Sequence, residues 1–201
     1  MKSRPCLSFI LALMSSAIVA CQSGGSTTGS GTSTTAGGPV SASNAKAAQL
    51  DADVNEAVAQ LYKHAPGSER LVQQAKGMLV FPNVYKGGIG IGGEYGKGEL
   101  RVKDRTVGYY STTSASFGFQ LGAEARTIVL MFMTDKALSD FENSAGWSVG
   151  GNADVALIKV GANGQVDSST VGQPVIAFVF GNSGLMYDLS LQGTKVTKID
   201  L

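Results

Sequence analysis

Beyond Gly77 the apolar residues recur mainly at every second position, and this alternation constrains the fold more than any other feature of the chain. Successive side chains of a β-strand point to opposite faces, so a period of two predicts strands. Glycine-rich and Asn-Gly segments between the alternating runs are typical of turns. The predicted strands cover 78–81, a hairpin at 89–102 that turns at Gly96-Lys97-Gly98, and then 107–111, 114–122, 126–133, 153–160, 174–180, 184–191 and 195–199.

The segment before Gly77 has the period of a helix instead. Its apolar residues fall on one stripe, which predicts a helix: Leu50, Val54, Val58 and Leu61. This helix is expected to begin at a cap on Ser43 or Asn44 and to stop before Pro66. Short helices are also predicted over 68–76 and, after a cap at Thr134, over 135–143. The fold class is therefore α+β, with N-terminal helices packed on a glycine-rich, mainly antiparallel β-sandwich or barrel-like sheet.

The first residues have the pattern of an export signal. Lys2 and Arg4 precede an apolar stretch over 7–20, which is about 14 residues long and too short to span a bilayer. The aliphatic and small residues just before Cys21 resemble a bacterial lipobox. We therefore expect a lipoprotein signal peptide over 1–20 and a lipid-anchored Cys21. The alternative is an ordinary secretory signal that happens to precede a cysteine.

Residues 21–43 consist of the lipidated cysteine and a segment rich in Gly, Ser and Thr, which predicts a flexible linker. The functional domain is then 44–201. Cys6 leaves with the signal and Cys21 carries lipid, so no cysteine remains for a disulfide or a thiolate metal site. Gln22 after the lipidated residue favours the outer membrane, facing the periplasm of a bacterial envelope.

The charge balance excludes general nucleic-acid binding. The chain has 16 basic and 15 acidic residues, and phosphate binding needs clustered Lys and Arg. One such cluster falls in the predicted hairpin and is a candidate headgroup or phosphate site: Lys97, Arg101, Lys103 and Arg105. The acidic neighbours Glu94, Glu99 and Asp104 offset it, so a solvated edge hairpin is the alternative.

The sequence has little catalytic chemistry. His64 is the only histidine and stands near a predicted helix end, where it interacts with the helix terminus rather than acting as a base. The run Gly88–Gly93 satisfies G-x-G-x-x-G, but it lies within alternating strand residues, so we expect close packing there and no nucleotide. We therefore predict no catalytic residue, no metal and no cofactor.

Two groups of large apolar residues have alternative interpretations. Aromatic residues and methionines at strand spacing predict an ordinary core, or an apolar groove that accepts an acyl chain: Phe117, Phe119, Met131, Phe132, Met133, Phe178 and Phe180. Trp147, in a glycine-rich stretch, is expected to plug the core, and an anchor at the membrane interface is the alternative.

Several segments together resemble the SYLF domain over about residues 70–199. They are Ala75–Pro82, Gly90–Gly96, Gly108–Tyr110, Ser116–Ala123, Val129–Thr134 and Gly184–Tyr187. The resemblance implies a lipid-binding module. Its eukaryotic members bind phosphoinositides, some yeast members bind and bundle actin, and bacterial members are exported envelope proteins. The eukaryotic lipid contact uses a basic N-terminal segment, whereas the helix here has only Lys46 and Lys63 among acidic residues.

The expectation is a noncatalytic envelope lipoprotein whose domain binds phospholipid or a phosphoinositide-like headgroup. Lys76, which the resemblance marks, and Lys86 join the four hairpin residues as candidate headgroup contacts. The expected partner is membrane lipid, which the protein contacts through the acyl anchor on Cys21 and through the domain. The alternatives are a structural module of the envelope that binds an unknown protein partner, and an acid/base enzyme with two carboxylates facing each other in a deep pocket.

Overall fold

The strands form one curled sheet in the part of the chain that the computed structural model describes, namely residues 39–118, 124–158, 172–181, 184–185 and 190–201. All of it belongs to the compact unit Gly37–Leu201. The strands are β1 (Gly77–Val102), β2 (Arg105–Gly118), β3 (Glu124–Phe132), β4 (Trp147–Ser148), β5 (Ala156–Leu157), β6 (Val175–Gly181), β7 (Gly184–Leu185) and β8 (Lys195–Ile199).

Their order in the sheet is β4-β8-β2-β1-β3-β6-β5, with β7 added to β6. Every pair is antiparallel except β5 with β6. The predicted α+β class is confirmed, and of the two expected arrangements the sheet has the barrel-like one, because its strands follow one path and curl around an apolar interior.

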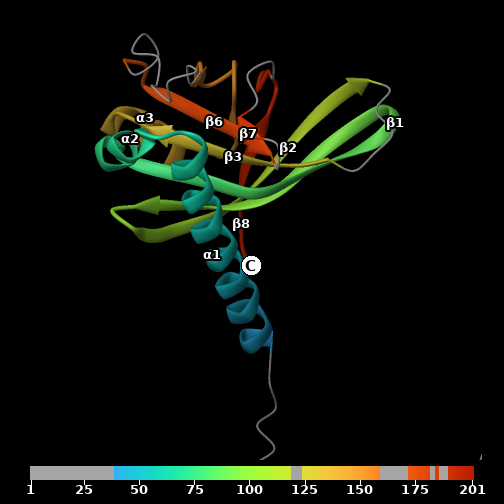
Figure 1. The fold of residues 1–201 in the computed structure, drawn as a ribbon. Helices are drawn as coiled ribbons and strands as arrows, with labels where there is room; N and C mark the ends of the chain where they lie inside the picture. Colours follow the sequence, from blue (N-terminus) through green and yellow to red (C-terminus); the bar gives the residue numbers. More distant parts are fainter. Residues whose placement is uncertain (1–38, 119–123, 159–171, 182–183, 186–189) are drawn as a thin grey trace, which may run out of the picture. The chain divides into compact units, whose positions relative to one another are not determined.

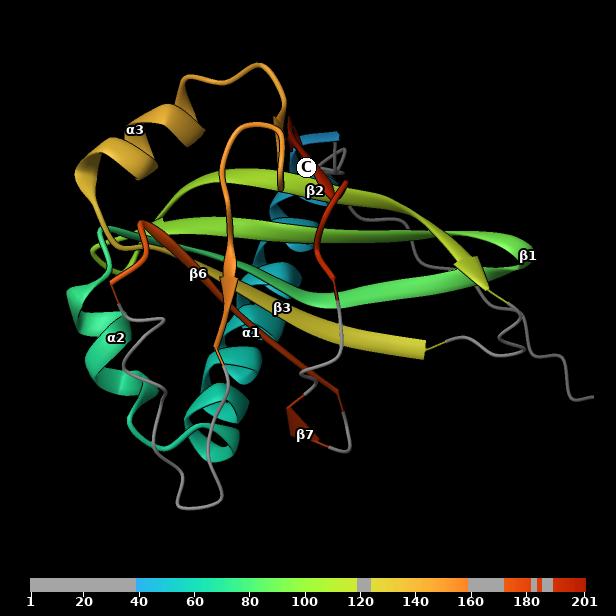
Figure 2. The ribbon, with the colours of Figure 1, turned by 90° about the horizontal axis from the view of Figure 1, so that it is seen from above.

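Strand β1 is the spine of the sheet and doubles back on itself, as the long green ribbon shows in both views (Figures 1 and 2). Its first limb, from Gly77, pairs with β3, and its second limb, ending at Val102, pairs with β2. The limbs lie against each other at two glycines. A Cβ on Gly98 would stand 2.2 Å from the carbonyl oxygen of Val80, so only glycine permits this approach.

The predicted position of the hairpin turn is therefore wrong. Gly96-Lys97-Gly98 is not a turn but lies within the second limb, and its glycines serve the close contact between the limbs. The turn lies at Lys103 and Asp104 instead, and both residues have positive φ, at 50° and 61°. Two successive residues of that conformation make the tight turn whose twist suits a hairpin. Close packing was expected over Gly88–Gly93. A Cβ on Gly93 would make only an ordinary contact, and the surroundings of residues 88–91 lie outside what the structure describes.

Pro82 lies inside β1 and does not end a strand there, contrary to the prediction of a strand closed at Phe81. The register against β3 shifts between Phe81 and Val84, which is the mark of a β-bulge. A bulge accommodates proline because its missing N–H is not required by the ladder. The Pro82 carbonyl oxygen accepts a hydrogen bond of 2.9 Å from the Thr127 hydroxyl, which holds the bulge to β3.

The helices agree closely with the expectation. Helix α1 (Pro39–His64) begins before the predicted cap, α2 (Ser68–Gln74) ends two residues earlier than predicted, and α3 (Asp135–Glu142) follows Thr134, whose hydroxyl accepts from the Ala137 amide. Leu138 and Phe141 of α3 are buried, as expected. The predicted signal peptide, Cys21, most of the linker and the strand residues 119–122, 159–160 and 186–189 lie outside the described residues.

The sheet has an apolar cluster on each face. Helices α1 and α2 cover one face, α1 through Val54 and Leu61 and α2 through Leu71. These residues share a cluster with Met131, Phe178 and Phe180 of β3 and β6. The other cluster fills the inside of the curl and includes Leu138 and Phe141 of α3. Figure 2 shows α3 at this side of the sheet. Of the seven residues predicted to be core, Met131, Phe132, Phe178 and Phe180 are buried and Met133 is partly buried against them. The side chains of Phe117 and Phe119 lie outside the described residues.

Trp147 belongs to the cluster inside the curl. It is 2% exposed and packs edge-on against the rings of Phe132 and Phe141. This confirms the interpretation as a core plug and excludes a membrane anchor at this residue.

Candidate functional site

Helix α1 crosses one face of the sheet (Figure 1). A groove of about 340 Å³ lies beside it. The groove lies between the first half of α1 and the two limbs of β1. The helix contributes Lys46, Gln49, Leu50 and Asp53. The sheet contributes Pro82, Asn83, Tyr85, Tyr95, Gly96 and Lys97, and Leu201 completes the wall. The β1 residues share one groove because the strand doubles back and brings positions 82–85 beside 95–97.

Two tyrosines give this groove an unusual surface. Tyr85 is 56% exposed and Tyr95 is 49% exposed, whereas most other large apolar side chains of the described residues are buried. They stand on opposite limbs of β1, paired with Ala125 of β3 and Thr113 of β2. The ring of tyrosine is apolar and its hydroxyl is polar, so exposed tyrosines suit a boundary between an apolar phase and water.

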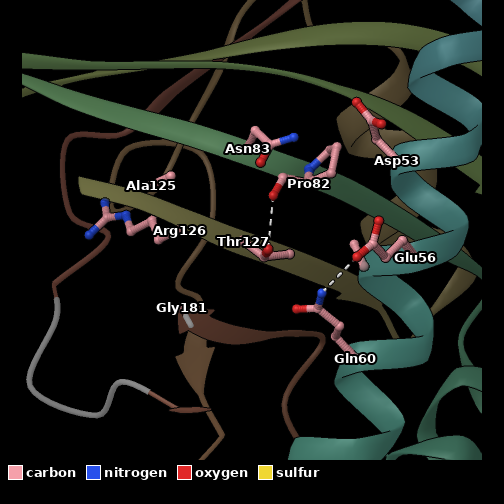
Figure 3. Close-up of a pocket in the computed structure, with 10 residues that line it drawn as sticks. Asp53, Glu56, Gln60, Pro82, Asn83, Ala125, Arg126, Thr127 and Gly181 are labelled. Atoms are coloured by element: carbon pink, nitrogen blue, oxygen red, sulfur yellow. Dashed lines mark hydrogen bonds between the residues drawn. The ribbon is translucent and has the colours of Figure 1, made fainter. Parts of the chain in front are cut away.

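A second, smaller cavity of about 210 Å³ adjoins the groove and is polar (Figure 3). Asp53, Glu56 and Gln60 point into it from α1, one helical turn after another. The opposite wall comes from the bulge of β1, the start of β3 and the end of β6: Pro82, Asn83, Ala125, Arg126, Thr127 and Gly181. Asp53 accepts a hydrogen bond of 2.8 Å from the Gln49 amide, and Glu56 one of 3.2 Å from the Gln60 amide.

This arrangement differs from the carboxylate pair that an acid/base enzyme would need. Asp53 and Glu56 belong to the same helix and each accepts from an amide of that helix, and the guanidinium of Arg126 is turned away from them (Figure 3). In the part of the chain that the structure describes, no three His, Cys, Asp or Glu side chains gather in a group that could hold a metal ion.

A third cavity, of about 550 Å³, lies beside α3 on the other face of the sheet. Its polar side chains include Lys136 and Asp140, which form an ion pair with each other at 2.6 Å. The pair is one helical turn apart and exposed, so it belongs to the helix surface.

Arg101 fastens α1 to the sheet. Its guanidinium bonds Asp51 at 2.8 Å and Asn55 at 2.7 Å on the helix, and it forms a short ion pair with Glu99 on its own strand. The Arg101 side chain is 14% exposed and the Glu99 side chain is 0% exposed. A buried carboxylate needs a paired charge, so Arg101 is committed to these partners.

Arg126 and Glu94 form a second buried ion pair. It joins β3 to the second limb of β1 through a short contact, and the Ser114 hydroxyl donates to Glu94 at 2.9 Å. The two side chains are 9% and 7% exposed. The Arg126 Nε is buried without a hydrogen-bond partner.

The six predicted headgroup residues are spread along β1 and into its turn. Lys97 lies in the second limb of β1 and Lys103 in the turn that follows it, six residues further on, which corresponds to roughly 20 Å of extended chain. Lys103 and Arg105 are exposed at the turn into β2.

Lys76 precedes β1 and lies 3.8 Å from Asp135 of α3, and Lys86 stands near the end of the first limb. Of the six, Lys97 lines the groove, where it is joined by Lys46 of α1.

Sequence reasoning missed the pair of exposed tyrosines and the polar cavity. Tyr95 fell within the predicted hairpin over 89–102, whereas Tyr85 fell between the predicted strands. Only the course of β1, with its bend between the two residues, brings both to one groove. The ion pair of Arg126 with Glu94 was missed for a similar reason, because it joins residues 32 positions apart. A signal did exist in the isolated charges of otherwise apolar or glycine-rich strands, since an unpaired charge there is costly.

The fold and this surface define an α+β domain built on one curled, mainly antiparallel sheet, with a groove whose rim carries aromatic and basic side chains. Residues 113–200 match the model of the Ysc84 family, described as Las17-binding protein actin regulator. This match confirms the resemblance to the SYLF domain, a family of lipid-binding and actin-regulating domains that is not a known enzyme family. No curated protein matches the chain. No described helix has the length and apolar character that a membrane span requires.

Proposed function

We propose that this protein is a noncatalytic lipid-binding domain that is tethered to a membrane of the bacterial envelope by acyl chains on Cys21. The groove between α1 and β1 is the surface that contacts lipid. The tether favours the outer membrane, facing the periplasm, because Gln22 follows the lipidated residue. Since tethering keeps lipid at a high local concentration, a weak contact is enough for occupancy.

The observation that carries this proposal is the pair of half-exposed tyrosines on the rim of an apolar groove that also has two lysines. Tyrosine rings enter the boundary between headgroups and acyl chains, and Lys46 and Lys97 are placed to meet phosphate there. The candidates Lys76, Lys86, Lys103 and Arg105 stand elsewhere along β1 and its turn, so in this proposal they contribute only long-range attraction. Arg101 has a structural role.

Vesicle flotation tests the groove directly. The chain from residue 22 onward, which contains the whole compact unit and no acyl group, is mixed with phospholipid vesicles. Changing Tyr85 and Tyr95 to Ser removes both rings. Val107→Ser is the matched control, because Val107 is a comparably exposed apolar residue, at 47%, on β2.

The wild type and the Val107 variant are expected to float, while the double tyrosine variant stays at the bottom. Burying about 80 Å² of each ring is worth about 2 kcal/mol, or roughly 30-fold in affinity per tyrosine. Equal flotation of all the chains would remove the groove from the proposal. Mass spectrometry of the protein made in bacteria tests the tether, and an unmodified Cys21 would contradict it.

A protein-binding module of the envelope is the second candidate. It is favoured by the description of the matching family, which names a binding partner and a regulator. This candidate predicts a stoichiometric complex with an envelope protein at physiological salt, and no flotation with vesicles. Lipid binding without such a complex would exclude it.

A further inference from the structure

The outer edge of strand β2 is open over its last five residues. On one side β2 pairs with β1 along its whole length, from Arg105 to Gly118. On the other side it pairs with β8 only from Tyr109 to Thr113. Among the described residues, no strand pairs with this side of 114–118. Both views show the end of β2 at the opposite end of the sheet from α3 (Figures 1 and 2). The backbone groups that point outward there can pair with another chain.

The other open edges of the described sheet have features that block such pairing. The short strands β4, β5 and β7 have two residues each. The outer side of β8 has the exposed Lys198, and the start of β2 has the exposed Arg105. The start of β3, which β6 does not pair with, contains Glu124 and Arg126. Short edge strands and charged residues are the usual protection against edge-to-edge pairing. Residues 114–118, Ser-Ala-Ser-Phe-Gly, have neither.

The surface beside this edge favours a second copy of the chain as the partner. The exposed Ala115 lies opposite the exposed Gly93 of β1, on the same face of the sheet as Tyr95. A foreign peptide strand is selected by pockets that take its alternate side chains, and these two small residues form no pocket. A second copy needs none, because identical antiparallel edges match each other by two-fold symmetry. The segment 111–118 contains no charged residue, so two copies do not repel each other there.

We propose that the chain forms a two-fold symmetric dimer in which residues 114–118 of two copies pair antiparallel and join their sheets. In such a pairing the same face of each sheet lies on one side, so the grooves with Tyr85 and Tyr95 face the same way. The two Tyr95 residues then stand about three strand spacings apart across the strands, roughly 15 Å. This inference goes beyond the proposed function and does not depend on it. If the grooves do contact lipid, the dimer brings two of them to one bilayer and binds it more tightly than a monomer.

Sedimentation equilibrium of the chain from residue 22 onward tests the dimer without any lipid. Five residues form only a few backbone hydrogen bonds, so we expect a dissociation constant on the order of 100 µM. Ala115→Lys places like charges beside the shared edge and should weaken the dimer on the order of tenfold or more. Ala125→Lys is the matched control, because Ala125 is an exposed alanine of β3 at the other border of the same part of the sheet. It should keep the association of the wild type.

Hydrogen exchange at low and high protein concentration locates the contact. The outward-pointing amides of 114–118 should exchange more slowly in the dimer, while those of 105–108 on the same strand stay unchanged. This measurement decides the matter if circular dichroism shows that Ala115→Lys is unfolded.

Three results would overturn the proposal. A wild type that stays monomeric up to about 1 mM would leave this edge to a different partner. An association that Ala115→Lys leaves intact, or that Ala125→Lys weakens equally, would place the contact elsewhere, and so would protection only outside 114–118. Flotation with vesicles tests the lipid-binding function separately, so a monomer that floats defeats the dimer alone.

Discussion

Replacing Arg101 by Met should destabilise the domain far more than its partly exposed position suggests. The Arg101 guanidinium joins two environments. On one side it bonds Asp51 of α1, whose side chain is 53% exposed, and on the other it pairs with Glu99, whose side chain is fully buried. The exposed contact with Asp51 and the buried contact with Glu99 contribute very different free energies to stability. The substitution therefore shows which contact matters more for holding α1 on the sheet.

The contact with Asp51 is worth about 0.2–1 kcal/mol, because water screens an exposed pair. The contact with Glu99 decides the outcome. Without Arg101, the buried carboxylate keeps only the Thr106 hydroxyl at 3.4 Å, and its Oε2 already has no partner. Leaving such a charge unpaired costs about 3–5 kcal/mol. Arg101→Met should therefore lower the free energy of unfolding by about 3–5 kcal/mol.

Urea unfolding followed by circular dichroism measures these differences. Asp51→Ala should cost about 0.2–1 kcal/mol, since it removes only the exposed contact. The double change of Arg101 to Met and Glu99 to Leu should recover most of the loss, because the buried charge leaves with its partner. A cost below about 1 kcal/mol for Arg101→Met, or no recovery in the double variant, would refute the argument. A charge reversal at Arg101 would for the same reason report on folding and not on lipid binding.

Two further predictions concern the packing and the pH dependence of the sheet. Gly98→Ala should lower the free energy of unfolding in urea by about 1–3 kcal/mol, because the added Cβ collides with the Val80 carbonyl. Gly93→Ala is the control and should cost clearly less, since its nearest atom would be 3.7 Å away. Equal costs would contradict the close approach of the two limbs. Burial, and then the charge of Glu142, raises the pKa of Tyr110 above 10.0. The folded state thus keeps the proton longer than the unfolded chain, so this contribution to stability is present below pH 10 and is lost as the pH rises through the folded-state pKa. Tyr110→Phe should show a smaller loss of stability above pH 10, and an unchanged pH profile would exclude this residue as the cause.

The helices and most strands could be predicted because each rests on a local pattern. The stripe of Leu50, Val54 and Leu61 and the cap at Thr134 act within a few residues, and β8 has the predicted bounds 195–199. The course of β1 could not be predicted in the same way. A proline and several glycines suggest breaks, yet Pro82 is accommodated by a bulge and Gly98 by the opposite limb, and both depend on tertiary contacts.

The candidate site was predictable only in its residue types. The basic residues near the end of β1 were expected to form one binding site. Because a strand is extended, residues that are close in the sequence lie far apart along it, and the charges do not gather at one place. Arg101 was predicted to contact a headgroup because of its charge. In the structure its guanidinium pairs with Asp51 of α1 and with Glu99 of β1 instead. Tyr85 and Tyr95 had no local signature, because their meeting depends on the bend between them.

The most direct test of a groove that meets the bilayer uses a spin label and its accessibility to oxygen and to a polar nickel complex. The two cysteines of the chain are Cys6 and Cys21, so the chain from residue 22 onward has none, and a single label can be placed at Tyr95→Cys or at Val107→Cys. On addition of vesicles, the label at position 95 should gain oxygen accessibility and lose nickel accessibility, while the label at 107 stays unchanged. No change at position 95, or the same change at both positions, would contradict the account.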